Sequence, residues 1–129
     1  MQKIRILAVS ILLSFSVPAF SQTTAEGLFQ TDVADATNQE IVVLEVTYPP
    51  GHSSSSHRHN AHTVVYVLEG TMKMAVAGGE TLTLGPGEVF YENPDDIHSV
   101  SMNASDTEPA KILVFFLKEK DAPSTEPAG

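Results

Sequence analysis

The chain has 129 residues, with 16 acidic and seven basic side chains, a formal net charge of −9 and no cysteine. Its length suits one domain, and the absence of cysteine excludes a disulfide framework or a thiolate site. The acidic balance argues against a nucleic-acid partner, because such affinity comes largely from Lys and Arg that neutralise phosphates.

The first 21 residues have the three-part pattern of a secretory signal. Lys3 and Arg5 precede an apolar run at 6–15, and Ala19-Phe20-Ser21 has small residues at both ends of a cleavage site. A retained membrane anchor is the weaker alternative, because a spanning helix needs roughly 18 to 20 apolar residues. We therefore expect cleavage after Ser21, a secreted or periplasmic protein, and no membrane contact after cleavage.

The rest of the chain alternates short β-prone runs with turn residues, and no helix-length segment has apolar residues at three-to-four spacing. Residues 22–39 form an N-terminal segment with a candidate edge strand at 28–33. Further strands are expected at 41–47, 63–69, 71–77, 80–84, 87–92, 98–103 and 111–120. Turn signals separate them, among them Pro49-Pro50-Gly51, Gly78-Gly79, Gly85-Pro86-Gly87 and Asn93-Pro94-Asp95-Asp96.

This pattern predicts an all-β fold. For residues 40–120 we expect a single antiparallel β-barrel of jelly-roll type, because closure removes exposed strand edges. Residues 121–129 are rich in proline and small residues with nothing to bury, so we expect a flexible tail.

Histidines are concentrated in one window, since four of the five lie between residues 51 and 70. His57 and His59 are two apart, so on an extended chain both point to the same side. The same parity continues through Thr63, Val65 and Val67, which we expect inside the barrel.

His98 opens a later strand that can bring its ring beside the first two histidines. Three converging neutral imidazoles form a ligand set for one divalent first-row metal. The alternative is a polar cluster without metal, which is costly because buried imidazoles need partners. His62 is a further candidate ligand if the chain bulges after His59, and otherwise a surface residue. His52 is expected in a solvated loop.

At these residues the sequence resembles the cupin superfamily. The first cupin motif places a glycine, His-x-His, a glutamate and a second glycine at set spacings, and this chain has Gly51, His57, His59 and Gly70 at matching positions. The second motif has a proline-rich turn before a histidine, and Gly85-Pro86-Gly87, Pro94 and His98 are similar to it. The resemblance covers about residues 40–118.

Two positions depart from the family pattern. Thr63 occupies the glutamate slot, and Asp95 stands where a glycine is usual. Thr63 is therefore a weak candidate for an additional ligand. If only His57, His59 and His98 bind, the metal keeps open positions for water, oxygen or substrate, as catalytic sites require.

The resemblance implies a jelly-roll barrel that binds one divalent metal ion, which could be Fe, Mn, Zn, Ni, Cu or Co. We expect a metal-dependent, dioxygenase-like oxidoreductase that oxidises a small organic substrate with oxygen. The alternative is a non-catalytic module that binds a metal or a small ligand, and fold alone does not separate the two. Glu92 and Tyr91 are candidate acid or base groups.

A homodimer is also expected. Strand edges or the apolar face of residues 111–120 would form its interface.

Overall fold

The computed structural model describes residues 22–129, and within this range every regular element is a β-strand. No helix in the described range could therefore span a membrane. The strands are β1 (Thr24–Asp32), β2 (Gln39–Tyr48), β3 (His57–Arg58), β4 (Ala61–Glu69), β5 (Met72–Val76), β6 (Leu82–Leu84), β7 (Val89–Glu92), β8 (His98–Asn103), β9 (Ala110–Glu119) and β10 (Glu126–Pro127).

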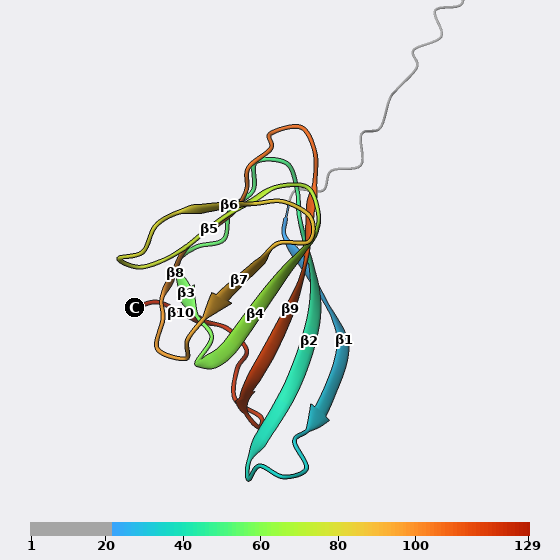
Figure 1. Cartoon of the computed structure of the whole chain (residues 1–129), viewed down its shortest axis with the longest axis vertical. Helices are drawn as coiled ribbons and strands as arrows, with labels where there is room; N and C mark the ends of the chain where they lie inside the picture. The colour runs from blue at the N-terminus through green and yellow to red at the C-terminus, as the bar shows by residue number, and fades with distance from the viewer. Residues whose placement is uncertain (1–21) are drawn as a thin grey trace, which may run out of the picture.

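The strands form two five-stranded sheets in which neighbouring strands are antiparallel (Figure 1). The first sheet has the order β1-β2-β9-β4-β7, and the second has the order β10-β3-β8-β5-β6. Strands that are distant in sequence pair within each sheet, as β2 does with β9. The predicted all-β jelly-roll fold is confirmed, in the form of a two-sheet sandwich.

The core lies between the two sheets, and burial alternates along β4 and β9. In β4, Thr63, Val65 and Val67 are buried, whereas the intervening residues Val64 and Tyr66 are exposed. The prediction that these three residues point inward is confirmed. Their faces pack on the inward residues of neighbouring β9, which include Ile112, Val114 and Phe116.

The chain passes from the second sheet to the first between Arg58 and Ala61. β3 belongs to the second sheet and ends at Arg58, whereas β4 joins the first sheet from Ala61. Asn60 makes the corner with a φ of 49°, in the left-handed region that asparagine tolerates. As a result, His57 and Thr63 lie in different sheets, and His59 lies at the corner between them.

The C-terminal segment, expected to be a flexible tail, lies along β3 in this structure. Glu126 pairs with Arg58, Pro127 pairs with His57, and the Asn60 side-chain amide donates to the Glu126 carboxylate at 2.7 Å. β3 and β10 have two residues each, and neither was expected from the sequence. The tail therefore forms one wall beside the histidines.

Candidate metal centre

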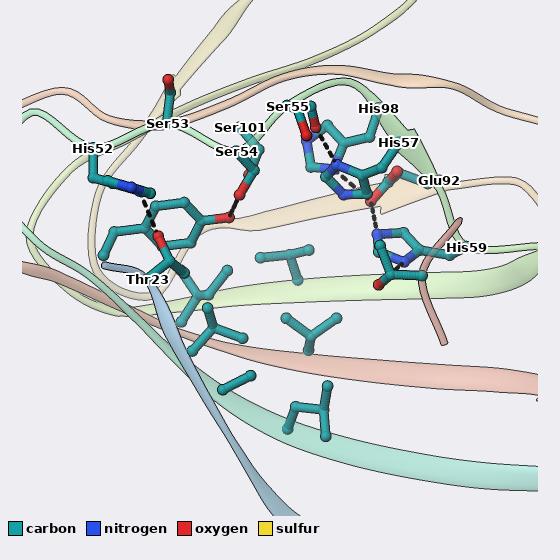
Figure 2. A pocket seen from close by; sticks show the side chains of 18 of the residues that line it. Thr23, His52, Ser53, Ser54, Ser55, His57, His59, Glu92, His98 and Ser101 are labelled. Carbon is teal, nitrogen blue, oxygen red and sulfur yellow. Dashed lines mark hydrogen bonds and ion pairs between the residues drawn. The ribbon is translucent and has the colours of Figure 1, made fainter. Parts of the chain in front are cut away.

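Two of the three predicted ligands are brought together by strand pairing. His57 in β3 and His98 in β8 are directly opposite each other in an antiparallel pair, so their side chains lie on the same face. His59 follows at the corner after β3. One ring nitrogen of each of the three residues lies within 4.8 Å of those of the other two. The structure thus gathers His57, His59 and His98 at one point between the sheets (Figure 2).

Backbone carbonyls orient two of the imidazoles. The Nδ1 atom of His57 lies 2.7 Å from the carbonyl oxygen of Ser55, and that of His59 lies 2.7 Å from the carbonyl oxygen of Ser124. Because a carbonyl only accepts, each Nδ1 carries the proton and donates it. The Nε2 atom of each neutral ring then keeps its lone pair for a metal.

His98 is held differently. It is 3% exposed, and neither of its ring nitrogens has a hydrogen-bond partner among the described residues. Its ring stacks on Phe90, with centroids 5.5 Å apart. A buried imidazole without partners costs free energy unless a ligand satisfies it, so a metal ion fits the chemistry of this group.

Glu92, the last residue of β7, is the nearest carboxylate to the cluster. Its Oε2 atom lies 3.3 Å from His98 Nδ1 and 3.9 Å from His59 Nε2. The sequence marked Glu92 only as a candidate acid or base and did not place it at the histidines. The alternation of buried and exposed residues in β7 was the available signal, since it turns Glu92 and Phe90 inward together.

The buried groups of this centre have strongly shifted pKa values. Burial raises the pKa of Glu92 to about 7, and the charge of Asp96 acts in the same direction. Burial also lowers the pKa of His59 to about 4 and that of His98 to about 3, with His57 contributing to both. Near neutral pH both imidazoles are therefore uncharged, which is the form that binds metal ions.

The remaining candidates are not among the three clustered residues. His62 is exposed, and its Nδ1 atom lies 2.7 Å from the hydroxyl oxygen of Tyr91, which is also exposed. Thr63 is fully buried, but its hydroxyl donates to the carbonyl oxygen of Ala61 at 3.3 Å. His52 lies in a loop, with its Nδ1 atom 2.6 Å from the hydroxyl oxygen of Thr23.

The departure at Asp95 does not disturb the turn before His98. Asp95 does not have a positive φ, so the turn does not need a glycine at this position. The Asp96 carboxylate closes the turn by accepting from the backbone N–H of Asn93 at 2.7 Å. This short, hydrogen-bonded link fixes the spacing between Glu92 and His98.

The histidine cluster opens into a cavity of about 560 Å³ between the sheets. This volume is in the range of sites for small organic molecules. Its walls are largely apolar, formed by Leu44, Val46, Val65, Ile112, Val114 and Phe116. Thr125 and Pro127 of the C-terminal segment also line it, so the tail helps to enclose the site.

A hydroxyl cluster lines the same cavity (Figure 2). The hydroxyl oxygen of Tyr48 lies 2.9 Å from the hydroxyl oxygens of both Ser54 and Ser101. All three residues line the cavity. The cavity therefore combines nitrogen ligands, apolar walls and hydroxyl groups, an arrangement suited to a small molecule with polar and apolar parts.

Solved structures with the same fold support this architecture. A double-stranded β-helix protein from Klebsiella pneumoniae is 21% identical, with 94% of this chain and 95% of that chain covered and a TM-score of 0.62. The polyketide cyclase RemF from Streptomyces resistomycificus is 24% identical, with coverages of 84% and 72% and a TM-score of 0.63. An oxalate oxidase in complex with glycolate is 20% identical, with coverages of 87% and 57% and a TM-score of 0.63. At these identities the likeness shows the fold alone.

Sequence comparison identifies the family. No curated protein sequence matches this chain significantly. The family model for the cupin domain, however, matches residues 44–116, more than half of the chain, and this range includes all three clustered histidines. The chain therefore belongs to the cupin family.

Proposed function

We propose that this cupin binds one divalent transition metal through His57, His59 and His98 and uses it to oxidise a small organic substrate with oxygen. The observation that carries the proposal is the convergence of three imidazoles at the wall of a cavity of about 560 Å³. The polyketide cyclase and the oxalate oxidase with this fold support small organic molecules as the substrate class.

The residues of the cavity would bind the metal, exclude water and orient the substrate. A bound metal would supply a Lewis-acid and redox centre, with open positions beyond the three imidazoles. The apolar walls would exclude bulk water from the substrate. The hydroxyls of Tyr48, Ser54 and Ser101 would hold a polar group of the substrate at a fixed place in the cavity.

Elemental analysis combined with oxygen uptake tests this function. We expect about one metal ion per chain in the wild type, and substrate-dependent oxygen uptake by the iron-loaded protein with a panel of small hydroxy and keto acids. His98→Ala should lose both, whereas the matched variant His52→Ala should keep the metal. Metal binding without oxygen uptake on any substrate would favour the non-catalytic binding module. Absence of metal would contradict the proposal as a whole.

We also propose that the protein works as an exported homodimer. The outer face of the first sheet supports the dimer, because five apolar or aromatic side chains between 36% and 53% exposed lie together there: Val64, Tyr66, Val89, Tyr91 and Phe115. A second copy that packs on this face would bury them. Residues 1–21, which the sequence predicts to be a secretory signal, lie outside the described residues.

Native mass spectrometry of the exported protein tests both parts. We expect each chain to begin at Gln22 and the native complex to have twice the mass of one chain. The Phe115→Asp variant should have the mass of the monomer. A retained N-terminal segment would contradict export, and a wild-type monomer at tens of micromolar would contradict the dimer.

A further inference from the structure

Glu92 is a buried carboxylate without a partner. It is 2% exposed, and neither of its oxygens has a hydrogen bond to any described residue. A buried carboxylate is costly unless it is paired, hydrogen-bonded or coordinated to a metal. The described part of the chain places no Lys or Arg in an ion pair with it, since its neighbours within ion-pair distance are His59 and His98.

The carboxylate faces the same space as the imidazoles. Its Oε2 atom is 3.3 Å from one ring nitrogen of His98 and 3.9 Å from one of His59, and Figure 2 shows it directed at them. We infer that Glu92 is a fourth protein ligand of the metal and supplies an oxygen from the first sheet. This inference rests on the proposed three-histidine site.

Strand pairing explains why a carboxylate is available at this position. Glu92 in β7 is directly opposite Thr63 in β4, so the two side chains share the inward face, with Cβ atoms expected roughly 4.5 to 5.5 Å apart. The Thr63 hydroxyl donates to the Ala61 carbonyl and is not directed at the imidazoles. The carboxylate that the sequence lacks at position 63 is thus supplied by the adjacent strand.

The same arrangement connects the two sheets through the metal. Glu92 ends β7 of the first sheet, whereas His57 and His98 belong to β3 and β8 of the second. The Asn93 to Asp96 turn holds Glu92 near His98 through the hydrogen bond between the Asn93 N–H and the Asp96 carboxylate. A metal bound by all four residues would join the two sheets.

An anionic oxygen ligand changes which metals the site prefers. Imidazole suits Zn, Cu, Ni and Fe, whereas carboxylate oxygens suit harder ions such as Mn. A site with three imidazoles alone would therefore be poorer for Mn(II) than a site that also has Glu92. This difference separates a ligand from a residue that only supports the fold, because a packing defect would weaken binding of all metals alike.

Calorimetric titration of the metal-free, full-length domain with Mn(II) and Zn(II) tests the inference. We expect Glu92→Gln, which keeps the side-chain shape, to weaken Mn(II) binding by at least about tenfold and Zn(II) binding by less. Glu92→Asp keeps the carboxylate and should bind Mn(II) more tightly than Glu92→Gln. The visible absorption of the Co(II)-loaded protein should also change in Glu92→Gln, because a ligand is lost.

The controls separate this inference from the proposed function. Glu80 is exposed and has no ion pair among the described residues, so Glu80→Gln removes the same charge and should leave both affinities unchanged. Wild-type Mn(II) affinity and an unchanged Co(II) spectrum in Glu92→Gln would overturn the role of Glu92 while leaving the three-histidine site intact. A wild-type protein that binds no metal would overturn the proposed function itself.

Discussion

Excess Mn(II) or Zn(II) is expected to raise the melting temperature of the metal-free protein by about 10 to 20 °C. The three candidate ligands come from strands β3 and β8 and from the corner after β3, so the assembled site exists only in the folded state. A ligand that binds only the folded state at 100 times its Kd stabilises it by about 2.7 kcal/mol. In a domain of this size, 1 kcal/mol corresponds to roughly 4 to 8 °C. Thermal unfolding followed by circular dichroism measures the shift.

Histidine variants should reduce this shift in melting temperature to different extents. His98→Ala should abolish it, because His98 is buried with both ring nitrogens unpartnered among the described residues. His57→Ala and His59→Ala should reduce it strongly. His52→Ala should keep the full shift, since His52 lies in the loop beside Thr23. A full shift in the triple variant at positions 57, 59 and 98 would show that the metal binds elsewhere.

The alternation of inward and outward side chains along a strand predicted the long strands and the histidine cluster well. It predicted that Val65 and Val67 point inward, and it predicted strand 98–103 with the bounds that β8 has in the structure. It also brought His57 and His59 together, although for a partly different reason. The two residues do not lie on one strand with Thr63, because the chain changes sheets at Asn60.

Features that depend on distant pairing could not be found in this way. β3 and β10 are two residues each and have no pattern of their own, since they form only by pairing with each other and, for β3, with β8. Glu92 reaches the site because β7 pairs with β4 in a register that sets it opposite Thr63. A single sequence does not contain that register, so it did not place Glu92 beside the histidines.

The contribution of Glu92 to the stability of the metal-free protein is expected to fall as the pH rises from about 4.5 to about 7. Folding raises the pKa of Glu92 from 4.5 to about 7, so in this interval the unfolded chain releases a proton that the folded protein retains. The Glu92 contribution is therefore fully present below pH 4.5 and lost as the pH passes through 7. At about 1.4 kcal/mol per pKa unit, the loss is of the order of 3 kcal/mol at pH 8.

The histidines act in the opposite direction. Folding lowers the pKa of His59 and of His98 from 6.5 to about 4 and about 3. Their contribution is thus present above pH 6.5 and lost as the pH falls, because the unfolded imidazoles take up protons first. The groups that face Glu92 are these two histidines, His57 beside them and Asp96 in the adjoining turn.

Glu92→Gln should consequently stabilise the metal-free protein even though it weakens the metal site. The gain should be small near pH 5, where folded Glu92 is already protonated, and should approach about 3 kcal/mol at pH 8, where the carboxylate is ionised and unpaired. Urea unfolding at both pH values in the presence of a chelator measures the difference, with Glu80→Gln as the control for the loss of one charge. With excess Mn(II) the order should reverse, because only the wild type gains the carboxylate ligand. If Glu92→Gln is less stable than the wild type at pH 8 without metal, the carboxylate supports the fold directly, and the unpaired state described for it is wrong.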